Sequence, residues 1–100
     1  MDAELKAKWV KALRSGEYRQ GVRSFEHGGK YCCLGVLCVV AGKPPMLPDA
    51  TSNWPFVRDA LGGDREGIRN KLAEMNDGTF SWARNQQSFA QIADYIEQNL

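Results

Sequence analysis

An uncharged apolar run at residues 31–41 constrains the fold of this chain more than any other stretch. It contains no charged residue, and Gly35 is its only member that is not apolar. The run is too short to cross a bilayer, which takes ~20 apolar residues. Several of its residues follow the i, i+3, i+4, i+7 spacing of a helix, namely Leu34, Leu37, Cys38 and Ala41. We therefore expect a central helix that is buried nearly all round.

Three valines in the same run favour a different structure. Val36, Val39 and Val40 are β-branched, and such residues are enriched in strands. Periodicity alone does not separate a buried helix from a buried strand in so short a run. A buried strand therefore stays the alternative for residues 31–41.

The N-terminal segment, residues 2–14, has the pattern of a surface helix. Its apolar residues fall on one face with Trp9 as the anchor, and most of its basic residues lie off that face. Glu4 and Lys8 are spaced for an i, i+4 ion pair. Gly16 follows as a residue that favours the end of a helix.

The second half of the chain predicts three further helices, at residues 54–61, 64–78 and 88–100. Asp64 is the expected N-cap of the middle one, and Gly67 is expected to weaken its interior. Ser88 starts the last helix in a capping-box arrangement with the glutamine three residues on.

Residues 17–30 are too irregular for a helix and are expected to form a loop with a short hairpin. Gly28 and Gly29 tolerate the positive φ angles of a tight turn, with residues 23–27 and 30–32 as its arms. The proline-rich residues 42–53 are expected to be an extended connector. We thus predict a single, mainly α domain of residues 1–100, with four or five helices around the central one; the hairpin would make it α+β.

The cysteines and the N-terminus indicate where such a chain resides. All three cysteines lie within residues 32–38, a spacing that does not suit a disulfide framework. Asp2 and Glu4 stand where a signal peptide carries basic residues. We expect a cytoplasmic protein with reduced thiols and no membrane partner.

Charge is distributed unevenly along the chain. Residues 1–44 contain eight basic and four acidic residues, whereas residues 45–100 contain five and eight. The asymmetry could steer an anionic ligand towards the first half. Weak nucleic-acid binding by that half is one hypothesis, although a net charge of +1 is small for such a domain. A solvated charged surface is the simpler interpretation.

The two irregular segments, residues 17–30 and 79–87, carry side chains suited to a small anionic ligand such as a nucleotide signal. Arginines bind phosphate, and aromatic rings stack on bases. The candidate binding residues are Tyr18, Arg19, Gln20, Arg23, Trp82 and Arg84. In the alternative interpretation, the two aromatic side chains cover edges of the core and the arginines are solvated.

Cys32 and Cys33 are the residues most suggestive of catalysis. A thiolate at a helix N-terminus is stabilised by the helix dipole and by a nearby lysine, here Lys30. His27 is the only histidine and hence the only candidate imidazole base. A small cysteine hydrolase is therefore an alternative, against buried thiols that pack as small apolar groups. The spacing of these residues does not match a zinc site, and we predict neither a metal nor a cofactor.

Four stretches together resemble a known family. They are the Tyr18-x-Gln20-Gly21 motif, the YCCLGVLC block at residues 31–38, Met75 with residues 76–77, and the SFAQIADYIE segment at residues 88–97. They resemble an uncharacterised family of small bacteriophage and prophage proteins, and the resemblance extends from Ala3 to the C-terminus. It implies a phage-type accessory protein in the host cytoplasm, but no catalytic or binding residue is carried over from it.

Binding without turnover is the main functional hypothesis. The genome context of such phage families implies an inhibitor of host antiviral defence. Such a protein would sequester either a host defence protein or a nucleotide-derived signal. The cysteine hydrolase and the weak nucleic-acid binder are the alternatives.

Overall fold

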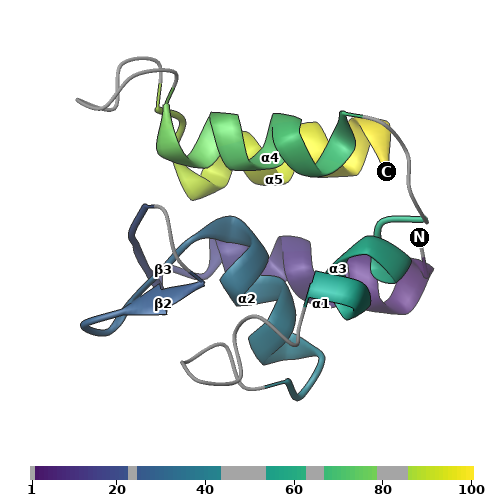
Figure 1. The fold of residues 1–100 in the computed structure, drawn as a ribbon, viewed down its shortest axis with the longest axis horizontal. Helices are drawn as coiled ribbons and strands as arrows, with labels where there is room; N and C mark the ends of the chain where they lie inside the picture. The colour runs from purple at the N-terminus through teal and green to yellow at the C-terminus, as the bar shows by residue number, and fades with distance from the viewer. Residues whose placement is uncertain (1, 23–24, 44–53, 63–66, 79–85) are drawn as a thin grey trace.

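The computed structural model describes residues 2–22, 25–43, 54–62, 67–78 and 86–100. Within them the chain forms five helices and three short strands, which confirms the mainly helical fold class (Figure 1). The elements are α1 Ala3–Arg14, β1 Arg19–Gln20, β2 Glu26–His27, β3 Lys30–Tyr31, α2 Cys33–Val40, α3 Trp54–Ala60, α4 Ile68–Asp77 and α5 Phe89–Asn99.

The helices form two layers with the small sheet at one end (Figure 1). α4 and α5 lie side by side in one layer, and α1, α2 and α3 make up the other. The core contains buried apolar residues from all five helices, together with Phe25. No helix in the described ranges is long and apolar enough to span a membrane.

α1 has the predicted bounds and the predicted buried face. Asp2 is its N-cap, since its Oδ2 accepts a hydrogen bond from the Leu5 amide at 2.8 Å. Trp9 is fully buried and anchors the helix. The Glu4–Lys8 ion pair is present at 3.9 Å between side chains that are mostly exposed, so it adds little stability.

α2 occupies most of the uncharged run, so the helical prediction is confirmed and the strand alternative is wrong. Residues 33–38 are all buried, because α1, α3, α4 and the sheet surround them. A helix closes its backbone hydrogen bonds within the segment, whereas a lone strand at this position would need a neighbouring strand on each side. The helix starts later than residue 31, since Tyr31 belongs to β3 and Cys32 is the N-cap.

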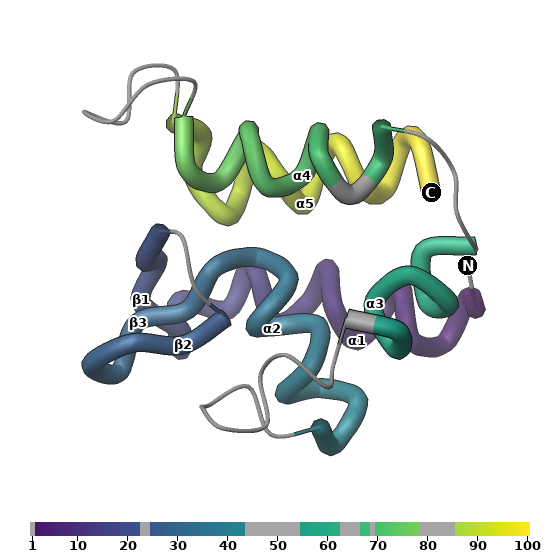
Figure 2. The backbone as a smooth tube through the Cα atoms, viewed as in Figure 1, coloured from purple at the N-terminus to yellow at the C-terminus, as the bar shows by residue number. Residues whose placement is uncertain are grey.

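The three strands form a sheet in the order β1-β3-β2 (Figure 2). β2 and β3 are antiparallel and joined at Gly28 and Gly29, whose φ angles of 59° and 81° are those of the predicted tight turn. The arms are shorter than predicted. β1 pairs with β3 in parallel, which the sequence did not predict, and the Gly21 amide extends this pairing to the Tyr31 carbonyl at 2.7 Å.

The C-terminal helices follow the predictions with one correction. α4 begins only at Ile68, because Gly67 has a φ of 94° and precedes the helix; its predicted place inside the helix is wrong. The predicted capping box of α5 is present, with Ser88 and Gln91 exchanging hydrogen bonds. The predicted Asp64 cap and most of the predicted 42–53 connector lie outside the described residues.

Candidate functional site

Three of the six predicted binding residues fall in the described part of the chain. Tyr18, Arg19 and Gln20 lie in β1 or directly before it. Arg23, Trp82 and Arg84 lie outside the described residues.

Tyr18 has a packing role at the edge of the sheet. Its ring stands at 90° to the ring of Tyr31, with the two centroids 5.4 Å apart. Such an edge-to-face pair is a favourable aromatic contact. Both rings are half-buried against the core, so this contact matches the alternative in which Tyr18 covers a core edge.

Gln20 does not reach into solvent, because its side chain is held by a buried asparagine. Its Nε2 donates to the Oδ1 of Asn76 at 3.2 Å and to the carbonyl of Gln87 at 2.7 Å. Asn76 also accepts from the Cys33 amide at 3.1 Å and donates from Nδ2 to the Gly21 carbonyl at 2.8 Å. We call this set of contacts the Asn76 network.

The Asn76 network connects four elements of the fold. Asn76 in the last turn of α4 is fully buried, yet its amide has partners on both its oxygen and its nitrogen. Cys33 continues the connection to α1, since its carbonyl accepts from the Trp9 indole nitrogen at 2.8 Å. The network therefore joins α1, α2, β1 and α4. The sequence alone did not indicate this network, because its members are distant from Asn76 along the chain.

The sheet aligns three basic side chains in a single row. Arg19 in β1 is paired with Lys30 in β3, and Lys30 is paired with His27 in β2. Residues paired across strands project on the same face of a sheet. All three are exposed, whereas the adjacent row of Gln20, Tyr31 and Glu26 is half-buried. We call Arg19, Lys30 and His27 the basic row.

The basic row forms no ion pair within the described part of the chain. Neither Arg19 nor Lys30 forms a salt bridge with any residue that the structure describes. Glu26, the acidic residue in this sheet, is turned towards the hairpin, where its Oε1 accepts from the Gly29 amide at 2.9 Å. Arg19 and Lys30 carry like charges directly opposite each other and repel, so the row favours binding of an anion.

A small pocket opens beside the basic row. His27 and Lys30 line it together with Gln20, Gly21 and Val22, and its volume is about 240 Å³. Val22 is the large apolar side chain most exposed in the described ranges, at 39%. Pockets for drug-sized ligands have volumes of roughly 300–1,000 Å³. This pocket is thus large enough for a phosphate group, and the remainder of a larger ligand would lie over the exposed face of the sheet.

The three thiols are buried and lack the character of a nucleophile. Burial raises the pKa of Cys32 to about 11 and that of Cys38 to about 12, and it also raises the pKa of Cys33. The helix N-terminus does act on Cys32, because the Gly35 amide donates to its sulfur at 3.3 Å. The sulfur therefore replaces the oxygen of a usual N-cap side chain, and desolvation outweighs the effect of the helix dipole that favours a thiolate.

We expect the folded protein to react slowly with iodoacetamide. A pKa near 11 in place of 9.0 lowers the thiolate fraction of Cys32 about a hundredfold at neutral pH. Because the thiol is also buried, the protein must open locally before the reagent can reach it. Intact-mass spectrometry at pH 7.5 should show labelling at least about a hundredfold slower than in unfolding urea. Rapid, selective labelling of Cys32 or Cys33 would contradict this assignment and favour the hydrolase.

No group of three metal-ligating side chains lies close enough to hold an ion among the residues that the structure describes. His27 is exposed on the hairpin, whereas Cys32 and Cys33 are buried beneath the sheet and α4. The arrangement in the described ranges is thus a solvent-exposed basic surface above a closed apolar core.

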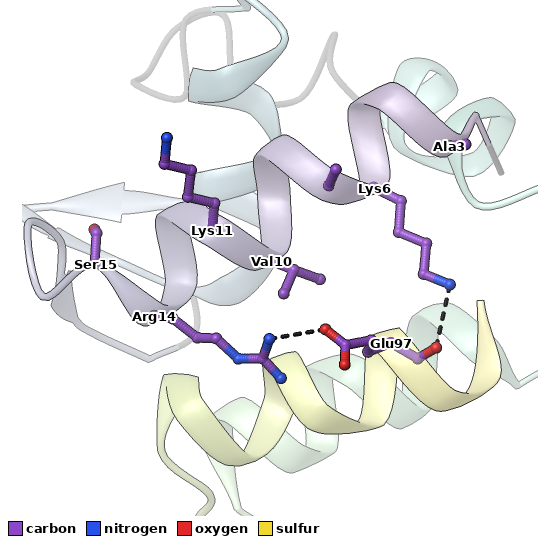
Figure 3. A pocket seen from close by; sticks show the side chains of 8 residues that line it. Ala3, Lys6, Val10, Lys11, Arg14, Ser15 and Glu97 are labelled. Atoms are coloured by element: carbon purple, nitrogen blue, oxygen red, sulfur yellow. Dashed lines mark hydrogen bonds and ion pairs between the residues drawn. The ribbon is translucent and has the colours of Figure 1, made fainter.

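A second hollow lies on another surface, along α1. It has a volume of about 790 Å³ and borders the C-terminal part of α5 (Figure 3). Ala3, Ala7 and Val10 contribute its apolar floor, and basic side chains stand at its edges. We call it the α1 groove.

Comparison with known proteins identifies similarity in the first half of the chain. No curated protein and no solved structure matches significantly. A family model described as a domain of unknown function (DUF8296) matches residues 1–47, the segment that contains α1, all three described strands and α2.

Proposed function

We propose that this protein is a small, non-catalytic binding protein that captures a phosphate-bearing, nucleotide-derived ligand on its sheet. The observation that carries the proposal is the basic row, which places Arg19, Lys30 and His27 side by side next to a pocket of phosphate size. Phosphate is recognised by charge-assisted hydrogen bonds of this kind.

The rest of the pocket supports the same class of ligand. Val22 supplies exposed apolar surface beside the charged groups, as a nucleoside would need. The Asn76 network holds the Gly21 carbonyl and the Gln20 side chain in place, so the pocket wall is rigid before binding. Preorganisation of this kind reduces the entropic cost of capture.

The biological setting of the proposal comes from the resemblance to small phage proteins. A phage accessory protein that removes a nucleotide signal without converting it would inhibit a host antiviral defence by sequestration alone. Such a role needs affinity and no catalytic group, which agrees with the burial of all three thiols. The family match itself carries no functional description, so this setting is part of the proposal.

The test is a thermal-shift screen against mononucleotides, cyclic mononucleotides, cyclic dinucleotides and inorganic phosphate. A ligand present at a hundred times its dissociation constant stabilises a protein by ~2.7 kcal/mol, which for a chain of this size raises Tm by roughly 10–20 °C. We expect at least one nucleotide to produce such a shift. Isothermal titration calorimetry would then give the affinity.

Two matched variants locate the binding. Lys30→Gln removes the middle charge of the basic row and should weaken binding about tenfold or more, because hydrogen bonds to charged groups contribute ~1.5–3 kcal/mol. The unfolding midpoint of the Lys30→Gln variant without ligand should stay the same or rise, since repulsion within the basic row is relieved. Lys71→Gln removes an exposed charge on α4 and should leave binding unchanged. Equal weakening by both variants, or no shift with any nucleotide, would contradict the proposal.

A further inference from the structure

The α1 groove has the form of a docking site for a helix. Its floor residues Ala3, Ala7 and Val10 follow the i, i+4, i+7 spacing of one helix face. The groove runs from Ala3 to Ser15, which is ~18 Å along the helix axis, or more than three turns. Two alanines in the floor allow the backbone of a second helix to approach closely, as ridges pack into grooves.

The edges of the α1 groove are positively charged. Lys6 and Lys11 stand on opposite sides of the floor, with Lys6 extending towards Glu97 of α5 and Lys11 pointing away from it (Figure 3). The Lys6 ammonium donates to the Glu97 backbone carbonyl at 3.2 Å, which leaves its charge uncompensated. Lys11 forms no ion pair with the described residues.

The acidic residues near the groove are already used. The Arg14 guanidinium binds Asp94 at 2.6 Å and Glu97 at 2.8 Å, so these two carboxylates balance Arg14 and hold α1 against α5. Lys6 and Lys11 therefore stand on either side of the apolar floor without an ion pair to any described residue. A partner that fills the groove must bring negative charge to both edges.

We propose that the α1 groove binds an amphipathic helix of another protein, with aliphatic residues along its centre and carboxylates on both flanks. Between its first and last turns the backbone N–H and C=O groups of α1 are bonded within the helix, so an extended peptide lying along the groove could not gain strand-like hydrogen bonds there. A second copy of this chain is unsuitable, because a two-fold axis would bring the lysine edges of two identical grooves together. This surface is separate from the basic row and does not depend on the function proposed for it.

The test uses three fluorescein-labelled peptides of about 16 residues, long enough to form a helix. The first has leucine and alanine at i, i+3, i+4 and i+7 with glutamates on the flanks. The second replaces each glutamate with lysine, and the third scrambles the first so that the apolar stripe is lost. Fluorescence anisotropy at about 150 mM salt, where distant charges are screened, should show saturable binding of the first peptide alone, at least about tenfold tighter than the others.

Charge reversal on α1 supplies the matched control. Lys11→Glu at the groove edge should weaken binding of the acidic peptide about tenfold, whereas Lys8→Glu on the same helix but outside the groove should change it less than about twofold. Ala7→Gln, which occupies the floor, should weaken binding about tenfold as well, with the circular dichroism of each variant confirming its fold.

Several results would overturn the inference. Equal effects of Lys8→Glu and Lys11→Glu, or equal binding of the scrambled peptide, would mean non-specific attraction between charges. Absence of saturation at about 1 mM peptide would mean that the groove has too little affinity for such a helix. A dimer in sedimentation equilibrium that Ala7→Gln dissociates would assign the groove to a second copy.

Discussion

Substitution of Gly35 by alanine is expected to destabilise the protein by about 3 kcal/mol or more, even though alanine is the better helix former. Gly35 lies in the buried first half of α2, and a Cβ there would collide with the carbonyl group of Phe25. That backbone is held, because the Phe25 carbonyl accepts from the Cys32 amide at 3.3 Å and the Phe25 side chain is buried. The gain of ~1 kcal/mol in helix propensity is much smaller than the cost of displacing the hairpin.

Urea denaturation followed by tryptophan fluorescence measures this effect. Gly16→Ala is the control, since Gly16, unlike Gly35, has no close neighbour: a Cβ there meets nothing within 4 Å, and only its φ of 78° opposes alanine. The control should lose about 1 kcal/mol from backbone strain alone. A Gly35→Ala variant as stable as the wild type would mean that the hairpin does not pack directly on α2.

Substitution of Asn76 by alanine is expected to cost about 3–5 kcal/mol, a large part of the 5–15 kcal/mol typical of a whole domain. The change leaves the buried Cys33 amide and the Gly21 carbonyl without their partner and opens a cavity at the centre of the Asn76 network. Each unsatisfied buried group costs ~1–3 kcal/mol. Urea denaturation of this variant should show a cooperative unfolding transition at a clearly lower urea concentration than that of the wild type.

Two further variants distinguish the loss of the hydrogen bonds in the Asn76 network from the loss of side-chain volume. Asn76→Asp keeps the shape but replaces the Nδ2 donor with an oxygen that faces the Gly21 carbonyl. Burial raises the pKa of a carboxyl, so this variant should be most stable at acidic pH and lose stability as the pH rises above the unfolded value of ~3.9. Asn99→Ala removes one exposed hydrogen bond to Tyr95 and should change stability by less than about 0.5 kcal/mol. An Asn76→Asp variant whose stability relative to wild type does not depend on pH would contradict a buried role for the amide.

The helices could be predicted because their signals are local. The end of α1 before Gly16, the capping box at Ser88 and the apolar faces that contain Trp9 and Leu72 are all encoded within a few residues. The turn at Gly28 and Gly29 was predicted for the same reason, since tight turns depend on positive φ at two adjacent positions. Gly67 was wrongly placed inside the helix, because a glycine inside a helix and a glycine just before it look alike in the sequence. Its left-handed φ angle of 94° is what puts it before the helix.

The candidate site could be predicted only in part, because it depends on contacts between distant segments. Arg19 was selected as an isolated exposed arginine, and nothing in the chain indicated that β1 would pair in parallel with β3 and align it with Lys30. Strands of two residues are too short to show the alternation of apolar and polar residues by which a strand is recognised in a sequence. Gln20 was predicted to bind a ligand, and in the structure it lines the pocket beside the basic row. The sequence did not indicate that its side chain also donates to Asn76, which lies 56 residues away.

The amino-acid sequence by itself determined which segments become helices, where the hairpin turns and that residues 32–38 of the uncharged run are buried, since hydrophobic periodicity and capping act over short distances. Tertiary structure alone decided that a buried asparagine joins four elements, that the thiols are desolvated, and that three basic residues from three strands form one row. These properties depend on which groups meet in space, and a hydrogen bond or a pKa is set by that neighbourhood and not by the residue type.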